Sequence, residues 1–435
     1  MKKIIIVLLL FSSTAFAQHV STDIAIKVST LHMRNTKRSD LSLSYVNQMF
    51  IDRHLCLYEV VFDDSSWCII PADMTAAPIL AYGFQRKTIE GWPDSFLKLI
   101  EWYKSQIDTI IYYCTDSIKT HPSWAKLLDS KQSGNYIVGD SLLDMTGRGQ
   151  LCWQQGKNND NGCTPSYNQD CPTSLPSCYS CSHYPVGCAA VALGELLWYW
   201  RWPTDSDQHD WDAMPSRIRN TSALDSASKV SKFLKECGES VNMTYQCSGS
   251  FAIMNNIVNA LYTTYNYKGA HKLKKTDWDY GSTWNNIIKS ELDNKRPVIF
   301  YGDSWAFFAG HYFVVDGYQE NYGSILYHVN WGHGGWNNCF CKLDRFKEIV
   351  YDGSEYDTHY YDINNRVIVG ISPTYSTNQN ITEFYYSNIH PGYKRQEYAT
   401  NSISLPSSNN TLTIEPSGKF ALEAGHTITL KDGFW

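Results

Sequence analysis

The chain has 435 residues, more than one ordinary domain contains, so we expect two or three domains. Hydrophobic residues make up 43% of the sequence, which excludes a wholly disordered protein. Charged residues make up only 18% and the net charge is −6, which argues against a nucleic-acid-binding protein and against electrostatic docking to anionic lipid. Thirteen cysteines are many for a cytosolic protein.

The N-terminus has the three parts of a secretory signal peptide. Lys2 and Lys3 form a basic start, residues 4–11 are an unbroken apolar run, and Ala15-Phe16-Ala17 is a small-x-small cleavage site. The run is too short to cross a bilayer, and no later stretch reaches the roughly 18 apolar residues that a membrane helix needs. We therefore predict a signal peptide over 1–17 and a secreted or extracellular, soluble mature protein without a membrane span.

Residues 18 to about 140 have the pattern of an α+β domain. Short apolar runs separated by turn-rich residues predict strands there. The runs are at 56–62, 67–70 and 79–84. A helix is expected to follow, opened by Pro93-Asp94-Ser95, because apolar residues recur near a 3.6-residue spacing from Phe96 to Ile111. We expect a small sheet covered by one helix.

The segment 147–184 is rich in Gly, Asn, Asp, Ser and Pro and holds five cysteines, so we expect a long loop ordered by disulfides. An amphipathic helix should begin near Cys188, with further helix over 228–266 and strands over 296–372, which is again an α+β pattern. After Pro373 the composition shifts to Ser, Thr and Asn, which predicts a small all-β module. The predicted divisions are 1–17, 18–140, 141–372 and 373–435.

Cys188 is the first candidate for chemistry. It follows Pro185-Val186-Gly187 and precedes an apolar stretch, which predicts that it lies in the first turn of a helix. Amide groups and the dipole at a helix N-terminus stabilise a thiolate, the nucleophilic form of cysteine. The spacing alone leaves two alternatives open, half of a disulfide or a packed core cysteine. Without Cys188 the chain keeps twelve cysteines, compatible with up to six disulfides.

A histidine and an asparagine form the second candidate feature. His311 opens one predicted strand, Asn330 closes the next, and residues 320–323 form the turn between them. The midpoint of positions 311 and 330 falls within that turn, so we expect the two side chains to face each other across an antiparallel hairpin, about 5 Å apart. An Asn beside a His orients the ring in Cys-His-Asn hydrolases. The alternative is a histidine that is simply packed in an apolar strand.

Several motifs in order along the chain resemble those of the streptopain family of secreted papain-like cysteine peptidases. The resemblance extends from about residue 25 to 372, and the strand region before residue 90 resembles the family's propeptide. The motifs are Ser141-Leu142-Leu143-Asp144, Trp153-Gln154-Gln155, Gly187-Cys188, Trp198-Tyr199-Trp200-Arg201-Trp202-Pro203, Asp210-Trp211-Asp212-Ala213-Met214-Pro215, Cys237-Gly238, Arg296-Pro297-Val298, Gly310-His311, Asp316-Gly317-Tyr318 and His328-Val329-Asn330-Trp331-Gly332. Residues 421–434 also resemble the short β-repeat ends appended to secreted Bacteroidetes proteins.

The resemblance implies a papain-like α+β fold and a catalytic set. Cys188 would be the nucleophile, and His311 the general base and acid. Gln155 would supply an oxyanion-hole side chain beside the Cys188 amide. Asn330 and Trp331 would orient and shield the histidine.

The resemblance also implies partners. Ser250 and Gly310 would bind the backbone of protein or peptide substrates, and residues 18–140 would be an inhibitory propeptide. The family needs no metal and no cofactor. The half zinc site Cys178-x-x-Cys181 has no second pair at a compatible spacing. We expect a monomer.

Three positions depart from the family pattern. The Thr that usually follows the nucleophile's small residues is Val191, the Asn before the oxyanion Gln is Gln154, and the second Trp of an Asn-Trp-Gly-Trp-Gly-Gly run is His333. None of the three removes a catalytic group. His333 is the one expected to alter specificity or the pH profile.

The segment 302–310 leads directly into His311 and predicts a substrate pocket. It has glycine at both ends, which permits hinge-like backbone changes, and three large aromatic residues that include Trp305. The functional interpretation is a mobile wall of an apolar pocket for the substrate side chain just before the scissile residue. The family's hydrophobic preference at that substrate position agrees. The alternative is a plug of core aromatics.

The sequence therefore predicts a secreted cysteine endopeptidase, made as a zymogen, that acts through a Cys-His acyl-enzyme. A second class of function is a catalytically altered relative that acts as an inhibitor or adhesin. The presence of Cys188, His311, Gln155 and Asn330 argues against it. A third is a papain-like acyltransferase, which forms the same acyl-enzyme but passes the acyl group to an amine.

Overall fold

The structure of the chain is a computed structural model. It describes residues 19–36, 41–86, 92–113, 120–128, 137–138, 141–144, 150–174, 181–203, 209–275, 282–302, 310–321, 324–343 and 365–373, together with short strands between 380 and 430. The predicted signal peptide and Trp305 lie outside these residues. Within the described part of the chain, none of the helices combines the length and the apolar character needed to cross a membrane.

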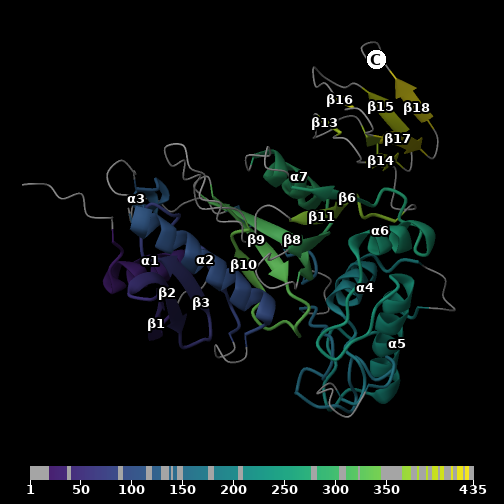
Figure 1. The fold of residues 1–435 in the computed structure, drawn as a ribbon, viewed down its shortest axis with the longest axis horizontal. Helices are drawn as coiled ribbons and strands as arrows, with labels where there is room; N and C mark the ends of the chain where they lie inside the picture. Colours follow the sequence, from purple (N-terminus) through teal and green to yellow (C-terminus); the bar gives the residue numbers. More distant parts are fainter. Residues whose placement is uncertain are drawn as a thin grey trace, which may run out of the picture.

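An antiparallel sheet forms the centre of the molecule (Figure 1). Its strands, in spatial order, are β1 (Leu43–Ile51), β2 (His54–Phe62), β3 (Trp67–Pro71), β4 (Ala81–Gly83), β10 (Cys339–Cys341), β9 (Ser324–Asn330), β8 (His311–Asn321), β7 (Val298–Gly302), β11 (Arg366–Val369) and β6 (His271–Lys274). Strand β4 pairs with β10, with Tyr82 opposite Phe340. The residues before and after position 140 therefore contribute to one continuous sheet.

Strands β2 and β3 are buried on both faces, which explains their continuous apolar runs, whereas β1 at the edge of the sheet is largely exposed. Trp67 and Ile69 of β3 pack with α2 (Asp94–Tyr113) on one face. Cys68 and Ile70 pack with α1 (Thr22–Asn35) on the other. The predicted strands are confirmed, but two helices cover this sheet where the sequence analysis expected one. The additional helix, α1, follows Ser21. The Ser21 side chain accepts a hydrogen bond from the Ile24 N–H at 3.3 Å and caps this helix.

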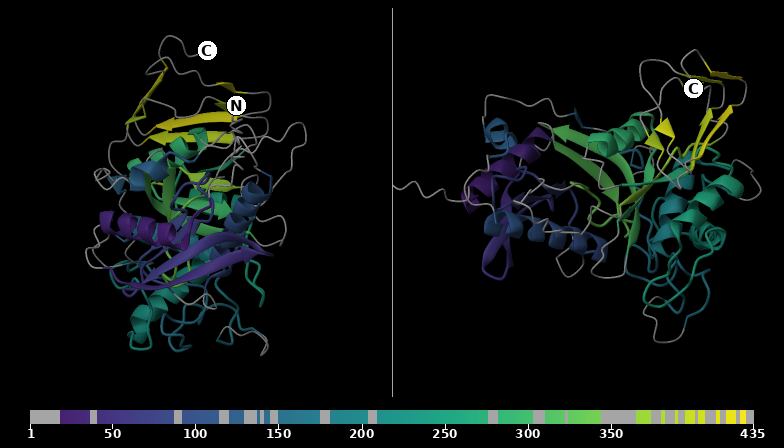
Figure 2. Two further views of the ribbon diagram at one scale, coloured as in Figure 1. Left: turned by 90° about the vertical axis from the view of Figure 1, so that its left-hand side faces the viewer. Right: turned by 45° about the horizontal axis from the view of Figure 1, so that its top comes forward.

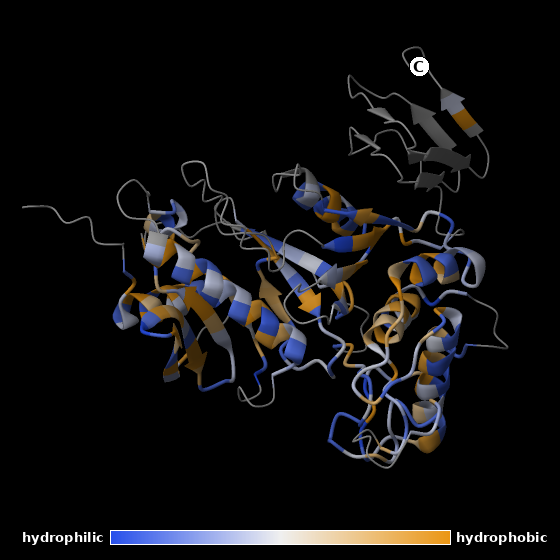
Figure 3. Ribbon diagram, in the orientation of Figure 1, coloured by the Kyte–Doolittle hydropathy of each residue, from blue (hydrophilic) through white to orange (hydrophobic). Residues whose placement is uncertain are grey.

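Helix α2 begins at Asp94, as predicted, and has an apolar stripe along one face (Figure 3). Phe96, Tyr103 and Ile107 are fully buried against the sheet. The Tyr103 hydroxyl donates to the backbone carbonyl of Lys342 at 2.6 Å. Helix α2 therefore contacts the strands of both halves of the chain.

Helix α4 (Cys188–Trp200) begins at the predicted residue but is not amphipathic. Every residue from 189 to 198 is buried, so the helix is enclosed by protein on all sides (Figure 3). Gly194 permits close packing against α5 (Leu224–Ser240), because a Cβ there would lie 2.8 Å from a methyl of Leu234. The other helices are α3 (Ser123–Leu128), α6 (Met254–Thr263) and α7 (Ser282–Asp293).

Two further expectations are answered around these helices. The predicted helical stretch 228–266 is two helices, because a loop with a bridge between Thr244 and Phe251 separates α5 from α6. The loop over 150–174 lacks helices and long strands in its described residues and is closed by a disulfide, Cys163–Cys181. Eight of the described cysteines, including Cys188, are free thiols, so the limit of six disulfides is not reached.

The β8–β9 hairpin has a β-bulge at Asp316. The buried Asp316 carboxylate accepts hydrogen bonds from the Ser141 hydroxyl at 2.8 Å and the Leu143 N–H at 2.9 Å. Its other oxygen lies 2.6 Å from Nδ1 of His328 on β9. The Leu142 N–H donates to the Asp316 carbonyl at 2.9 Å. The bulge therefore anchors residues 141–143 to the centre of the sheet.

The C-terminal residues form parallel strand pairs beside the rest of the molecule (Figure 2). Lys394 pairs with Lys419 and Ser402 with Thr427, 25 positions later, and Asn380 pairs with Ser402, 22 positions later. Such stacking of successive coils is the arrangement of a β-solenoid. The strands are β12 (Asn380–Ile381), β13 (Asn388–Ile389), β14 (Lys394–Ala399), β15 (Ser402–Leu405), β16 (Thr413–Ile414), β17 (Lys419–Ala424) and β18 (Thr427–Leu430).

The buried His328–Asp316 pair predicts a loss of stability at alkaline pH. Burial alone would lower the His328 pKa, but Asp316 raises it to about 9. A histidine pKa above the unfolded value of about 6.5 stabilises the fold fully below that pH, and the stabilisation is lost as pH rises toward 9. At roughly 1.4 kcal/mol per pKa unit, the loss is at most about 3 kcal/mol.

Urea unfolding of a Cys188→Ala background at pH 6.5 and pH 9.5 measures this loss. We expect a lower free energy of unfolding at pH 9.5, and a smaller difference when His328→Gln is added, because glutamine does not titrate. An equal pH dependence in both proteins would contradict the assignment.

Candidate active site

The Cys188 thiol lies at the N-terminus of α4, where backbone amides point toward it. The N-cap residue Gly187 has a φ of 93°, and a Cβ there would lie 2.8 Å from the Met243 side chain, so the turn before the cysteine requires glycine. Burial raises the pKa of the Cys188 thiol, whereas the backbone N–H groups of Tyr312, Ala189 and Cys188 itself lower it. The amides thus favour a thiolate that burial opposes.

Two predicted site residues hold the backbone that leads into Cys188. The Gln155 carbonyl accepts a hydrogen bond from the Val186 N–H at 2.8 Å, which places Gln155 beside the start of α4. The Ser250 hydroxyl donates to the Pro185 carbonyl at 2.6 Å. The Ser250 carbonyl would lie 3.0 Å from a Cβ on Gly187. Ser250 is buried, so its side chain supports the turn, and its carbonyl faces Gly187.

His311 is the first residue of β8, next to the Tyr312 N–H that points at the Cys188 sulfur. Its Nε2 lies 2.9 Å from the Trp331 carbonyl oxygen. Because a carbonyl can only accept, Nε2 carries the hydrogen and Nδ1 carries the lone pair of the neutral ring. Burial lowers the pKa of His311 to about 4. The ring is therefore neutral at pH 7, with one nitrogen available as a base.

The predicted pairing of His311 with Asn330 is wrong. Asn330 lies opposite Val314, and His311 lies opposite Gly302 on β7. The turn is centred later in the sequence than we assumed, because Asn321 pairs with Ser324. The bulge at Asp316 moves the register back by only one residue, so Asn330 still lies three residues from the predicted partner. The backbone carbonyl of Trp331, rather than the Asn330 side chain, binds the histidine.

Asn330 instead shapes the turn that presents this carbonyl. Its Nδ2 donates to the Leu151 carbonyl at 3.1 Å, and its Oδ1 accepts from the Gly332 N–H at 3.0 Å. Burial raises the pKa of the Glu195 carboxyl on α4, and the nearby Asn330 side chain opposes this shift. Asn330 is therefore close to the histidine but acts on the backbone of the turn.

The predicted substrate-binding residues lie around this centre. Trp331 is 1% exposed, and its Nε1 donates to the Asn337 carbonyl at 3.0 Å. Gly310 precedes His311 and leaves no room for a side chain, because a Cβ would lie 2.0 Å from the Tyr301 hydroxyl. Trp305 lies outside the described residues, so the predicted pocket wall has no structural description.

The start of α2 covers the site. The Phe96 ring packs edge to face on Trp331, with ring centroids 6.0 Å apart. Lys98 and Asp94 of the same helix act electrostatically on His311, Lys98 lowering its pKa and Asp94 raising it. The part of the chain predicted as a propeptide therefore contacts both Trp331 and the surroundings of the candidate base.

Sequence reasoning missed two features of the site. The Trp331 carbonyl was overlooked because a backbone acceptor leaves no mark in the residue types. The ring of His333 lies parallel to that of His311, with centroids 5.1 Å apart and an interplanar angle of 10°. His333 was noted only as a departure from the family pattern, and its sequence distance from His311 gave no signal of this contact.

Comparison with known proteins gives a consistent result. Residues 162–341 match the sequence profile of the Peptidase C10 family, a range that holds Cys188, His311 and Asn330 but not Gln155. The chain is 27% identical over 210 residues to the thiol protease/hemagglutinin PrtT of Porphyromonas gingivalis, covering 43% of this chain and 24% of PrtT. It is 23% identical over 316 residues to streptopain of Streptococcus pyogenes, covering 66% of this chain and 74% of streptopain.

A solved structure confirms the fold. The fragment of Prevotella intermedia prointerpain A aligns with a TM-score of 0.56 at 20% identity. The alignment covers 76% of this chain and 99% of that fragment. The predicted papain-like α+β fold is therefore confirmed. The chain spans only about a quarter of the length of PrtT, so the activities of that larger protein are not assigned to this chain.

The profile match, the relatives and the shared fold all indicate one family. Within the matched range, a free cysteine begins the buried helix and a histidine opens the adjacent strand, as a cysteine peptidase requires. Over residues 162–341 and over its longer match to streptopain, the chain is therefore similar to the C10, or streptopain, family of cysteine peptidases.

Proposed function

We propose that this cysteine peptidase hydrolyses internal peptide bonds with Cys188 as nucleophile and His311 as general base and acid. The observation that carries the proposal is that backbone groups act on both the Cys188 sulfur and the His311 ring. Backbone amides converge on the Cys188 sulfur at the start of α4. The bond from His311 Nε2 to the Trp331 carbonyl leaves Nδ1 with the lone pair.

These positions support an acyl-enzyme mechanism. Nδ1 of His311 takes the thiol proton, and the Cys188 sulfur attacks the substrate carbonyl carbon. The Cys188 N–H, with the Gln155 side chain as the proposed second donor, stabilises the negative oxygen that forms. The imidazolium then protonates the leaving amine as the peptide C–N bond breaks. Water, deprotonated by His311, hydrolyses the thioester and restores the thiol.

Replacement of the nucleophile is the first test. We expect Cys188→Ala to abolish hydrolysis of denatured casein while the folded-state spectrum is unchanged, because only the thiol is lost. His311→Ala should also abolish hydrolysis. Cys171→Ala is the matched control, since Cys171 is a buried free thiol of the same core and should retain activity. Residual activity of Cys188→Ala within tenfold of wild type would exclude the nucleophile assignment.

We further propose that the chain is made as a latent precursor in which residues 18–140 cover the active site. Phe96 on Trp331, and Asp94 and Lys98 near His311, support this proposal. In this covered state the thiol pKa is raised and the His311 pKa is lowered, so both groups are neutral at pH 7. A neutral thiol is a poor nucleophile, which agrees with latency.

The contacts of residues 137–138 and 141–143 with β8 limit where the maturation cut is expected. We propose that the cut lies between Lys131 and Gln150, because this stretch of the sequence is polar and contains Gly134 and Gly147, as exposed linkers do. Strand β5 (Ile137–Val138) pairs with β8, and residues 141–143 bind Asp316. These contacts hold the segment to the peptidase, so we expect the cut on the Lys131 side of Ser141, with N-terminal sequencing of the processed enzyme as its measurement.

The cover of α2 predicts the reactivity of Cys188 in the precursor. We expect slow labelling by iodoacetamide at pH 7, because a thiol with a pKa above about 8.5 is less than about 3% thiolate there. Phe96→Ala should speed labelling of Cys188 several-fold by removing the ring that covers Trp331. Because alkylation of Cys188 also blocks self-processing, the labelled chain stays intact and its mass can be measured by mass spectrometry.

Tyr112→Ala is the matched control for Phe96→Ala. Tyr112 lies near the other end of α2 and is 63% exposed, so its removal should leave the labelling rate of Cys188 unchanged. Equal labelling rates of Phe96→Ala and wild type would argue against a covering role for α2.

We propose a preference for a hydrophobic residue just before the scissile residue. Phe251 and Ile253 are 51% and 58% exposed and lie next to Ser250, whose carbonyl faces the turn before Cys188. These apolar side chains support an apolar subsite on that side of the thiol.

Substrate profiling tests this preference. Burial of one apolar side chain is worth roughly 1.5–3 kcal/mol, so peptides with Val, Ile or Phe at that position should be cleaved at least tenfold faster than those with Asp or Lys. Trp305→Ala should narrow the ratio if the aromatic segment forms part of the pocket. A profile without hydrophobic preference would exclude the subsite.

We also propose that the protein acts outside the cytoplasm. The predicted signal peptide and the disulfide Cys163–Cys181 support export to an oxidising compartment. Its substrates there would be proteins or peptides.

A further inference from the structure

His333 lies beside His311 and has no role in the proposed mechanism. Its ring lies parallel to the His311 ring at 5.1 Å between centroids. The Phe313 ring is also nearly parallel to His311, at 6.3 Å and 22°. His333 is half-buried, so solvent protons can reach it. The catalytic histidine therefore lies in a group of stacked rings, of which one can take up a proton.

The backbone around His333 is held in one conformation. Gly332, Gly334 and Gly335 have φ values of 68°, 74° and 79°, which other residues rarely adopt. The Gly334 N–H donates to the Trp153 carbonyl at 2.9 Å. A Cβ on Gly335 would lie 2.4 Å from the Cys152 sulfur. The turn packs closely against the loop over 150–160, and this packing restricts the position of the His333 ring.

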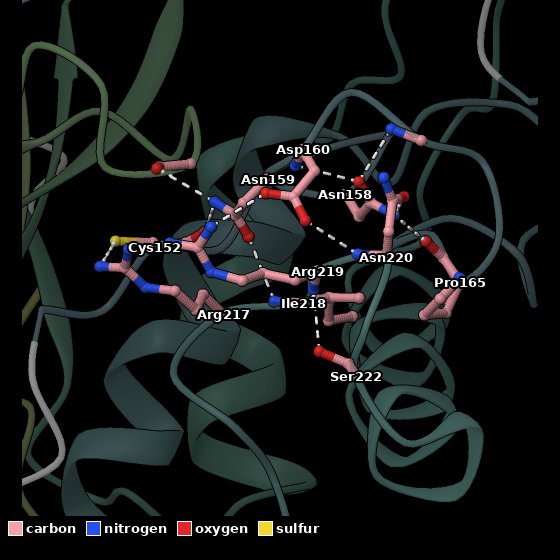
Figure 4. Close-up of polar contacts among 12 residues, drawn as sticks. Cys152, Asn158, Asn159, Asp160, Pro165, Arg217, Ile218, Arg219, Asn220 and Ser222 are labelled. Atoms are coloured by element: carbon pink, nitrogen blue, oxygen red, sulfur yellow. Dashed lines mark hydrogen bonds and ion pairs between the residues drawn. The ribbon is translucent and has the colours of Figure 1, made fainter.

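Asn159 ties this turn to two other segments (Figure 4). Its Nδ2 donates to the Gly334 carbonyl at 3.1 Å and to the Cys152 carbonyl at 3.0 Å. Its Oδ1 accepts from the Tyr167 hydroxyl at 2.6 Å and the Ile218 N–H at 3.1 Å. All hydrogen-bonding positions of the amide are thus used to connect the loops, and one of them fixes the residue that follows His333.

We propose that His333 is a positioning residue that supports the His311 ring and sets the acid limit of catalysis. This inference rests on the proposed role of His311. The active state has a Cys188 thiolate, a His311 imidazolium and a neutral His333. A proton taken up by His333 places a second positive charge against His311 and returns the first proton to the thiolate. Activity therefore falls at a higher pH than it would with an uncharged ring in this position.

The other groups that face the pair do not replace this effect. Lys98 and Asp94 act on His311 with opposite signs, and both belong to the proposed propeptide. On the side of the 150–160 loop, Arg217 contacts the Cys152 sulfur at 3.1 Å and keeps its charge at all relevant pH values, while burial raises the Cys152 pKa to about 12. In the described structure, His333 is the histidine whose ring stacks on the ring of His311.

The test compares processed wild type with His333→Phe and His333→Ala, using kcat/KM for a peptide substrate from pH 4 to pH 9. His333→Phe keeps a stacked ring without a titrating nitrogen. We expect its kcat/KM to stay within threefold of wild type at pH 8 and its acid midpoint to fall by at least 0.5 pH unit. His333→Ala should lower kcat at least tenfold at every pH with little change in KM, because the His311 ring loses its neighbour.

A second pair of variants tests the same inference away from the ring. Asn159→Ala frees the Gly334 carbonyl and should lower kcat as His333→Ala does. Asn220→Ala is the matched control. The Asn220 side chain accepts a hydrogen bond from Asn158 in the same network at 2.8 Å rather than from the glycine turn, so the kcat of this variant should be unchanged. Circular dichroism and thermal melts identify any variant that fails to fold.

The outcomes separate this inference from the proposed function. If the pH profile of His333→Phe superimposes on that of active wild type, His333 does not set the acid limit of catalysis. If kcat is unchanged in His333→Ala, His333 does not support the His311 ring. The pH dependence of Cys188 alkylation gives a second readout of the acid midpoint that needs no turnover. Retained hydrolysis in Cys188→Ala would instead overturn the catalytic assignment.

Discussion

The hydrogen bond from His311 Nε2 to the Trp331 carbonyl is the contact on which the site depends. It selects the tautomer and aims the second nitrogen of the ring. The bond joins the first residue of β8 to the residue just after β9, so it exists only if the hairpin register, with its bulge at Asp316, is correct. The buried carboxylate of Asp316 and the ring of His328 hold that register.

The residues around the catalytic pair also bear on the proposed latency of the precursor. Burial moves the pKa values of Cys188 and His311 in opposite directions, each toward its neutral form. If the proposed latency is correct, removal of the first turn of α2 exposes Trp331 and the surroundings of His311 to water and weakens the effect of burial on the His311 pKa. The proposed latency then requires a change in the solvation of the catalytic groups and no distortion of them.

Much of this arrangement is predictable from sequence, because short-range chemistry marks it. Gly187 before Cys188 and the apolar run after it indicate the helix start, and the strands around His311 follow from their apolar patterns. The register of Asn330 is not predictable in this way, because it depends on which residues form the turn and on the extra residue at Asp316, and neither is marked by the apolar pattern.

Long-range contacts are the other part that the sequence conceals. The stack of His333 on His311 depends on a glycine turn and on Asn159, which are brought together by three separate segments. The joining of β4 to β10 is similar, because no local pattern says that two predicted domains share a sheet. Helix α1 was missed for a simpler reason: its mixed composition gives a weak apolar period.

The parallel pairs at the C-terminus have a consequence for how this part of the chain can change. Each described strand there pairs with the strand one coil away, such as Ser402 with Asn380 on one side and Thr427 on the other. In such a stack, stability is the sum of nearest-neighbour interfaces. Because each coil contacts only its neighbours, we expect that deletion or duplication of one whole coil would leave the strand register of the other coils unchanged.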